Sequence, residues 1–544
     1  MGQAFLPACA DKSVCATKNL PQVRRCELNE YGAMMRDCEP RPARLVKKPH
    51  EGETTMTLSL RPKLLPLLVA ALLMSLAATA EPAAQAPAKV FPYPIHKKTL
   101  ANGLDVVVIE TPEFKDVLSY NTLVLAGARN ETEKGKTGLA HLFEHILFRH
   151  RYAGEESGYE DRMSRLGTHN NAWTWFDVTF YHPLTFTSNL AGKPDSGKHL
   201  RAEELPGVLQ LESSRFKALD FTEKIFKTET GAVLGEYRRN ASFPQLKMSE
   251  HLYALLFPHH PYGHETIGYY QDVLDMPNHY DAAVKFYDTY YRPNNCVLVV
   301  AGDVKADDIF AKVEPVYADW KAQPVPPIQA TGEPPKKEQR ERVAWDADVA
   351  PLVWVAYRMP AFKPGTTEGA VAQLLNELLV SPAAPLYKKL RYDKQTASQL
   401  GFEEGTQGFE SFDPRLLIVG AQLFKEKHAE RGPAYFDEVA GDIIAGLDEL
   451  KRFSKQKDAK KLLETLKSKY RYDFLAGLSS PADIAQNFAW YYRFTRDPEV
   501  FEKLLQSVEK LTPKDIDNFA RTYFVPENRA VLTLAYEAKP AAQK

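Results

Sequence analysis

The chain has 544 residues, which is long enough for two or more domains that each bury a core of their own. Hydrophobic residues make up 44% of it and charged residues 26%, an ordinary composition for a soluble globular protein. The net charge is −1 with histidine neutral, and no basic arm or stripe stands out, which argues against nucleic acid and anionic membrane surfaces as main partners.

The first recognisable segment is a targeting signal. Two basic residues, a short apolar run and the small-residue signal Ala-Thr-Ala follow one another between Met56 and Ala80. This order is typical of a secretory signal peptide that is cut after Ala80, and the apolar run is too short to span a membrane. We therefore predict a signal peptide over 56–80, a flexible lead-in over 81–89, and a periplasmic or secreted bacterial protein with no stable membrane anchor.

Residues 1–55 precede this signal, although export normally requires the signal at the N-terminus. We interpret them as the product of a mis-assigned translation start, and the alternative is a genuine disordered extension. Four of the five cysteines lie in this segment, so the mature chain keeps only Cys296 and no internal disulfide is expected. An exported enzyme of this size without disulfides suits a bacterial periplasm.

The rest of the chain alternates strand-like and helix-like segments. Runs of β-branched, aromatic and alternating residues predict strands at 103–110, 120–128, 170–182 and 352–361. Apolar residues at helical spacing predict helices at about 137–149, 368–380 and 434–453. Sheets combined with several long helices predict an α+β fold of two halves that form a clamshell, each half with helices packed on one face of a mainly antiparallel sheet.

An internal repeat divides the chain. The segments that begin at Phe286 and Phe519 share six residue types in register, namely Phe, Thr, Tyr, an aromatic residue, Pro and Asn, and the second segment begins 233 residues after the first. Each predicts a helix end, a Pro-Asn turn and an apolar strand, so the chain carries a duplicated domain. A Pro-rich, charged linker at 322–342 separates a first domain at 90–321 from a second domain at 343–544.

The helix predicted at about 137–149 contains the sequence HLFEH. His141 and His145 are four residues apart and therefore lie on one helical face, where both imidazoles can reach a single metal ion. Glu144 borders the same face and can take a proton from water that the metal binds. Taken alone, the motif also fits a buried helix that carries hydrogen-bonded histidines.

The repeat separates these two interpretations. Residues 374–378, which lie 233 positions after HLFEH, read LLNEL. The apolar helix therefore recurs without either histidine. The fold requires an apolar helix at this place but not the HLFEH sequence, which favours a functional site.

A catalytic zinc ion needs a third protein ligand and an open position for water. Glu229 and Glu236 lie downstream and are seven residues apart, or two helical turns, so both carboxylates can face one way. The segment between them, TGAVLG, is small and apolar, as a packed helix requires. The alternative is a solvated acidic face.

With these residues in view, the sequence resembles the pitrilysin/insulinase family of zinc metallopeptidases, the inverzincins, in its two-domain bacterial type. The resemblance covers essentially all of 90–544. The motifs that carry it are GLAHLFEH at 138–145, GTHNNAWT at 167–174, ETGAVLGE at 229–236, HPYGHETIG at 260–268 and Y-x-P-N-N with its following strand at 291–304.

The resemblance implies one zinc ion per chain, with His141, His145 and Glu236 as its ligands. It implies Glu144 as the general base and Glu229 as an acid that supports the ligands. The separation of His145 and Glu236 is longer than is usual in the family, and the stretch 185–205 accounts for it as an insertion. Glu229 is the fallback ligand.

The resemblance also implies a place for the substrate. In the family, the strand predicted at 170–182 presents an edge to the peptide, so Asn171 and Ala172 are predicted to bind substrate. The physical basis is β-augmentation, in which an extended peptide bonds to the backbone of an exposed strand and affinity depends little on side chains.

One position departs from the family pattern. Active members carry an Arg in the second domain and a Tyr seven residues later, which hold the substrate and steady the oxyanion. Arg391 fits the first position and is predicted to be catalytic, but Ser398 stands at the second. A serine hydroxyl is too short to replace the phenol of the missing tyrosine. Tyr392 lies nearby in the sequence and could take the place of that tyrosine. Otherwise the chain is a weak peptidase, or a partner chain supplies the Arg/Tyr pair.

The sequence thus predicts a zinc-dependent endopeptidase (hydrolase) that cleaves peptides or unfolded segments in an enclosed cavity. The alternative is a zinc-binding subunit of a two-chain peptidase with little or no activity alone. The expected partners are peptide substrates and either a second subunit of the same family or a second copy of this chain, with no nucleic acid. A subunit that merely stabilises a peptidase is disfavoured, because such subunits usually lose the zinc ligands.

Overall fold

A computed structural model describes residues 89–156, 158–191, 193–194, 204–329, 335–404 and 409–537. The extension and signal peptide predicted over residues 1–80 lie outside this range, as does all but the last residue of the lead-in. No helix of the described ranges is both long enough and apolar enough to cross a membrane.

The first domain is built on a seven-stranded sheet. Its order is β1–β2–β9–β3–β5–β4, with β6 also paired to β3, and every pair is antiparallel except β2 with β9. The strands are β1 (Ile95–Thr99), β2 (Asp105–Glu110), β3 (Val117–Val124), β4 (Ala172–Thr174), β5 (Thr179–Tyr181), β6 (Leu184–Phe186) and β9 (Cys296–Gly302). A two-stranded ribbon of β7 (Lys193–Pro194) and β8 (Glu204–Leu205) stands apart from it.

The second domain repeats this topology in five strands. Its order β10–β14–β11–β13–β12 matches β2–β9–β3–β5–β4, down to the single parallel pair at the same position. The strands are β10 (Gln339–Trp345), β11 (Leu352–Arg358), β12 (Gln399–Phe402), β13 (Leu416–Gln422) and β14 (Arg529–Tyr536). The predicted duplication and the α+β class with mainly antiparallel sheets are confirmed.

The C-terminal end of the predicted linker is part of a strand. β10 begins at Gln339, inside the range 322–342 that composition alone assigned to the linker. Its exposed residues Arg340, Arg342 and Ala344 alternate with less exposed ones, and the strand lies at an edge with a partner on one side only. Because most of its side chains are polar, composition alone does not distinguish this strand from a solvated linker.

Helices surround both sheets. Those of the first domain are α2 (Leu139–Phe148), α3 (Gly158–Arg165), α4 (Val208–Lys217), α5 (Glu223–Asn240), α6 (Pro244–Leu256), α7 (Tyr270–Asp275), α8 (Tyr280–Tyr290) and α9 (Ala306–Tyr317). Those of the second domain are α10 (Thr367–Leu379), α11 (Pro385–Lys388), α12 (Lys425–Arg431), α13 (Ala434–Glu449), α14 (Ala459–Ala476), α15 (Pro481–Thr495), α16 (Val500–Glu509) and α17 (Pro513–Tyr523).

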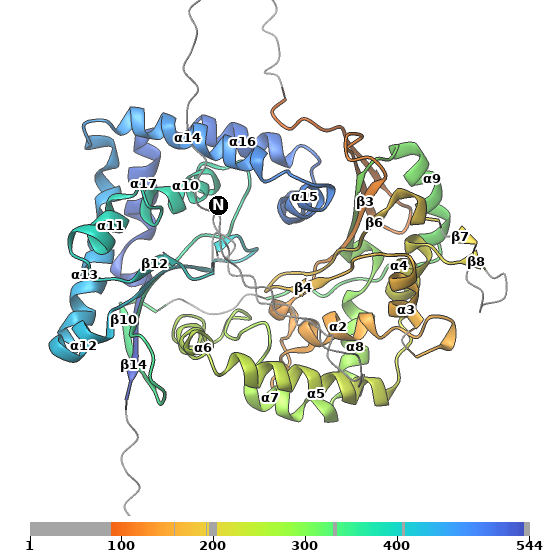
Figure 1. The fold of residues 1–544 in the computed structure, drawn as a ribbon, viewed down its shortest axis with the longest axis horizontal. Coiled ribbons are helices and arrows are strands. Elements are labelled where there is room, and N and C mark those ends of the chain that lie inside the picture. The colour runs from red at the N-terminus through yellow and green to blue at the C-terminus, as the bar shows by residue number, and fades with distance from the viewer. Residues whose placement is uncertain are drawn as a thin grey trace, which may run out of the picture. The chain divides into compact units, whose positions relative to one another are not determined.

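Each sheet is covered on both faces, because the domains exchange helices. Alternate residues of β2, such as Val106 and Val108, face a core made with the helices of the first domain. Val107 and Ile109 point the other way, into a core completed by Phe488 and its neighbours on α15 of the second domain. Figure 1 shows α15 beside β3, against which it packs.

The reciprocal contact is made by α6 of the first domain. It packs against β10 and β14, and its Met248 and Leu252 share a core with Trp354 and Leu532 of the second sheet. Residues 89–544 accordingly form one compact unit. The two domains are therefore held together by burial of apolar surface on both sides, not by the linker alone.

A substitution that creates a cavity in the core shared by the two domains tests whether the domains unfold together. Phe488 is fully buried, so Phe488→Ala is expected to lower the free energy of unfolding by about 3–5 kcal/mol. Because the core belongs to both domains, we expect one cooperative transition, measured by tryptophan fluorescence and circular dichroism in denaturant. Phe186→Ala is the matched control, since Phe186 is 51% exposed. Two separate transitions in the unaltered protein would contradict a shared core.

Candidate metal centre

The helix that carries HLFEH has a tightly specified start. Gly138 is its N-cap residue with φ +90°, and a Cβ at this position would lie 2.6 Å from the carbonyl oxygen of Ile267. Gly268 approaches from the other side with φ +90°, and a Cβ there would lie 2.8 Å from the Gly138 nitrogen. Only glycine fits both positions. The HPYGHETIG motif therefore fixes where α2 begins.

A buried carboxylate completes this start. Glu131 accepts hydrogen bonds from the backbone N–H groups of Gly138 (2.7 Å) and Ala140 (2.6 Å), two of the donors that a helix N-terminus leaves without partners. Burial raises the pKa of Glu131 to about 8, although these hydrogen bonds oppose the shift. A buried side chain thus satisfies two backbone donors at the start of α2.

The side chains of α2 then divide by face. Leu142, Phe143, Ile146 and Leu147 are fully buried, whereas His141, Glu144 and His145 are half-buried. This amphipathic pattern anchors one face in the core and presents all three polar groups of HLFEH on the other.

α5 brings both predicted acidic residues to this face. Glu236 Oε2 lies 3.6 Å from His141 Nε2 and 3.5 Å from His145 Nε2. Glu229 Oε2 lies 3.6 Å from the other ring nitrogen of His145, Nδ1. The structure therefore brings His141, His145 and Glu236 together around one point, and places Glu229 behind His145 instead of among the three donor atoms.

The donor atoms fit a zinc ion. Two ligands that are each about 2.1 Å from a tetrahedral ion lie about 3.4 Å apart, close to the separations of the Glu236 carboxylate from the two imidazoles. Two imidazole nitrogens and one carboxylate oxygen are a donor set typical of catalytic zinc, which keeps its fourth position open. The same distances are too long for hydrogen bonds.

The charges at the site also favour a cation. Burial lowers the pKa of His145, but its contacts with Glu229 and Glu236 outweigh burial and raise it to about 9. The contact with His145 lowers the pKa of Glu236 to about 2, against the effect of burial. Burial lowers the pKa of His141. A proton on His145 thus balances the carboxylates, and a divalent ion held by the same groups would displace that proton.

Arg149, which none of the sequence motifs singled out, supports the carboxylate of Glu229. Arg149 Nε donates to Glu229 Oε1 at 2.9 Å, and its Nη1 donates to Glu160 Oε2 at 2.5 Å. Arg149 follows His145 by four residues, as His145 follows His141, so the helical spacing already contained the signal. The chain Glu160–Arg149–Glu229 fixes the carboxylate that contacts His145.

The predicted base and the predicted substrate strand are in contact. Thr174 Oγ1 donates a hydrogen bond to Glu144 Oε2 at 2.8 Å. Thr174 ends β4, the strand at the edge of the first sheet, which is paired on one side only, with β5. Ala172 begins this strand, and its N–H donates to the Asn171 side chain at 2.9 Å. The edge expected to bind peptide therefore lies beside α2.

The residues of the expected Arg/Tyr pair are bonded within the second domain. Arg391 Nη1 donates to the carbonyl of Ala397 at 2.8 Å, and its guanidinium lies 5.9 Å from the ring centre of Tyr387. Ser398 Oγ donates to the carbonyl of Gln422 at 3.0 Å. Tyr392 is 57% exposed. No contact in the described part of the chain joins Arg391 to the HLFEH ligands, and its catalytic role stays a prediction.

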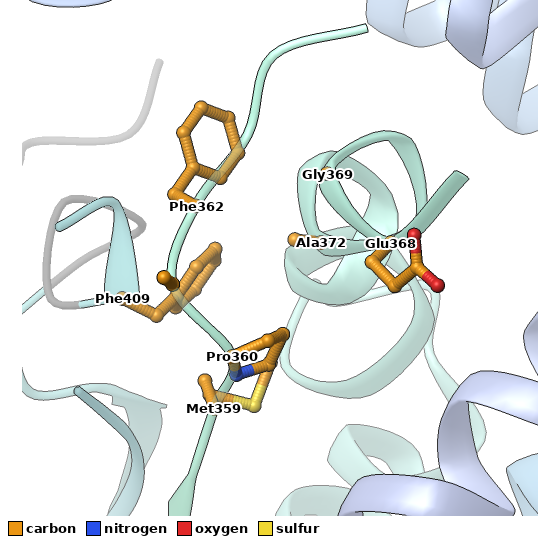
Figure 2. A pocket seen from close by; sticks show the side chains of 8 residues that line it. Met359, Pro360, Phe362, Glu368, Gly369, Ala372 and Phe409 are labelled. Carbon is orange, nitrogen blue, oxygen red and sulfur yellow. The ribbon is translucent and has the colours of Figure 1, made fainter. Parts of the chain in front are cut away.

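A crevice in the second domain offers no competing site. Its volume is about 10 Å³, room for at most one water molecule. It lies between the start of α10 and the segment that follows β11 (Figure 2). It is lined by Ala361 and by the residues that Figure 2 labels, which are Met359, Pro360, Phe362, Glu368, Gly369, Ala372 and Phe409.

Two family models match the chain. The family model described as "Insulinase (Peptidase family M16)" matches residues 106–269, which contain HLFEH and the α5 residues Glu229 and Glu236. The model described as "Peptidase M16 inactive domain" matches residues 279–463, which contain LLNEL and Arg391.

Curated relatives carry related names. The zinc protease PqqE of Helicobacter pylori is 28% identical over 405 residues, which cover 72% of this chain and 82% of that protein. The probable mitochondrial-processing peptidase subunit beta of Arabidopsis thaliana is 24% identical over 258 residues, which cover 47% of this chain and 45% of that protein.

Solved structures share the fold. A protease from Helicobacter pylori superposes with a TM-score of 0.71 at 24% identity, covering 82% of this chain and 100% of its own. A peptidase M16 inactive domain from Pseudomonas fluorescens superposes with a TM-score of 0.65 at 16% identity, covering 82% of this chain and 99% of its own.

The role of Arg149 can be measured through metal affinity. Arg149→Met keeps the aliphatic stem but removes the donors that hold Glu229, so His145 loses its fixed orientation. Changes to such supporting groups typically weaken metal binding 10- to 100-fold, and we expect a loss of about this size in zinc titrations. Arg162→Met is the control, because Arg162 pairs with the exposed Glu155. Unchanged zinc affinity in Arg149→Met would show that Glu229 needs no support.

Proposed function

Because the chain belongs to the insulinase (M16) family of peptidases, we propose that it is a zinc-dependent endopeptidase with Glu144 as its general base. The observation that carries the proposal is the convergence of two imidazoles and one carboxylate at tetrahedral spacing, with a further carboxylate held beside them. Several relatives are named zinc proteases, which supports zinc as the metal.

Each residue of the centre then has a distinct task. His141, His145 and Glu236 hold the zinc ion, which when bound supplies Lewis-acid chemistry: it lowers the pKa of water and polarises the scissile carbonyl. Glu144 is not a ligand, so its carboxylate is available to take a proton from the attacking water. It then delivers that proton to the nitrogen of the leaving amine. Glu229 keeps the ring of His145 in its binding orientation.

The free edge of β4 is the proposed docking place for peptide. A strand with one unpaired side offers backbone N–H and C=O groups to an extended chain, and this strand begins at Ala172, directly after Asn171 and beside α2. Only an extended segment can pair in this way. The proposed substrates are therefore peptides or unfolded stretches of protein, cleaved with limited dependence on side chains.

A second candidate function is the zinc-bearing subunit of a two-chain peptidase. The observation that favours it is the pair of apolar cores shared by the two domains, because opening the domains around a substrate would expose these cores to water. An enclosed cavity would then need a second chain. Arg391 is bonded within its own domain and Ser398 replaces the expected tyrosine, so that chain would also supply an Arg/Tyr pair. A family member that carries the pair could fill both roles, whereas a second copy of this chain could close the cavity but would bring Ser398 again.

The role of the base is tested by an isosteric substitution. Glu144→Gln removes the proton acceptor and keeps the shape, so we expect peptide cleavage to fall by about 10²- to 10⁴-fold with zinc content unchanged. The assay is hydrolysis of a quenched fluorescent peptide, with a chelator as a second control. Glu377→Gln is the matched variant, because Glu377 occupies the equivalent position of LLNEL and should leave activity intact. Equal cleavage by Glu144→Gln and the unaltered protein would refute the proposed base.

The need for a partner is tested with the same peptide. We expect the zinc-loaded chain alone to be slow, and a candidate partner that carries an Arg/Tyr pair to raise its rate about 10²- to 10³-fold, the usual contribution of one oxyanion-stabilising hydrogen bond. The mature chain is assayed alone and with each partner, and its mass in solution is followed by light scattering. Full activity of a monomer would refute the two-chain proposal. No cleavage with any partner would refute the peptidase proposal.

A further inference from the structure

We infer that Thr174 is a positioning residue for Glu144, and that β4 thereby links peptide docking to the orientation of the base. This inference rests on the proposed function of the metal centre. It adds a residue to which neither the sequence motifs nor the comparisons assign a role, and it gives the second domain a part in the reaction.

The first observation is the hydrogen bond itself. Glu144 accepts from Thr174 Oγ1 at 2.8 Å through one carboxylate oxygen, Oε2, while the other oxygen remains for a water proton. Both side chains are half-buried. A glutamate side chain has three rotatable bonds, and fixing one oxygen removes most of that freedom. The hydroxyl of Thr174 therefore selects one orientation of the base.

The second observation is the alternation along β4. Successive side chains of a strand point to opposite faces, so Thr174 faces α2 while Trp173 faces the other side of the sheet. There the Trp173 ring lies 5.1 Å from that of Phe180 and 5.8 Å from that of Trp490 on α15. One face of β4 therefore contacts Glu144 of the first domain through Thr174. The other face contacts α15 of the second domain through Trp173.

The third observation is that Trp490, which contacts Trp173, is itself held in place by neighbouring side chains. The indole N–H of Trp490 donates to the buried carboxylate of Glu410. The guanidinium of Arg493 lies 3.4 Å from the Trp490 ring centre and donates to the carbonyl of Glu410 at 2.6 Å. β4 has only three residues, so it owes its position to these contacts and to β5.

The geometry gives β4 two connected tasks. A peptide that pairs along the free edge of β4 would have its scissile carbonyl at a fixed position along the strand. Thr174, the last residue of the same strand, fixes the orientation of Glu144. Substrate and base are then aligned by one element instead of two. Small misplacements of reacting groups cost large factors in rate, so this shared support matters in the transition state more than in binding.

The experiment compares three threonine variants of the zinc-loaded full chain, together with any partner that it requires. Thr174→Val keeps the shape and removes the hydroxyl, and Thr174→Ser keeps the hydroxyl. Thr122→Val is the matched control, because Thr122 lies on β3 and its buried hydroxyl has no hydrogen-bond partner in the described part of the chain. The readouts are kcat and KM for a quenched peptide, zinc content, and the Glu144 side chain in crystal structures.

We expect Thr174→Val to lower kcat about 10- to 100-fold, as the loss of a hydrogen bond to a charged group implies, with KM and zinc content unchanged. Thr174→Ser should recover most of kcat, Thr122→Val should match the unaltered protein, and Glu144 should leave its position only in Thr174→Val. Unchanged kcat in Thr174→Val, or no recovery in Thr174→Ser, would overturn the inference. If the unaltered protein cleaves no peptide, the proposed function fails, and the position of Glu144 in the crystal structures still decides the role of Thr174.

Discussion

The structure depends on the need to cover two sheets that are apolar on both faces. Strands such as β2 and β9 bury nearly every side chain, so helices on one face leave a second apolar face exposed to water. Each domain solves this with a helix lent by the other, α15 on the first sheet and α6 on the second. Neither domain can therefore separate without exposing both cores.

The two copies show what a metal centre requires beyond the fold. α10 is the counterpart of α2, and the 18-residue helix α14, which packs against it, is the counterpart of the 18-residue α5. A shift of 233 residues turns the two histidines of HLFEH into leucines and Glu236 into Lys469, while Glu144 becomes Glu377. Lys469 Nζ lies 3.2 Å from Glu377 Oε1. In the second copy, an ammonium group thus balances the carboxylate in the part of the fold where the first copy gathers the proposed metal ligands.

This comparison also explains which features the sequence could reveal. His141, Glu144 and His145 lie within two turns of one helix, so spacing alone placed them on one face, and the repeat argued that they are not needed for folding. To predict Glu236 as the third ligand, one had to assume only that the helix carrying it packs against α2. Arg149 was visible in the same four-residue spacing. The strand at Gln339 was missed because its charged, edge-strand sequence resembles a linker.

Thr174 and the exchange of helices could not be found in this way, because both depend on contacts between distant segments. Thr174 and Glu144 are 30 residues apart, and Trp173 and Trp490 more than 300. No local period connects such pairs. The ligands of the proposed zinc ion all lie in the first domain, whereas β4, which carries Thr174, also packs against Trp490 of the second domain. A domain without metal ligands can therefore be indispensable to the reaction, since it holds in place the edge at which a peptide would be presented to the base.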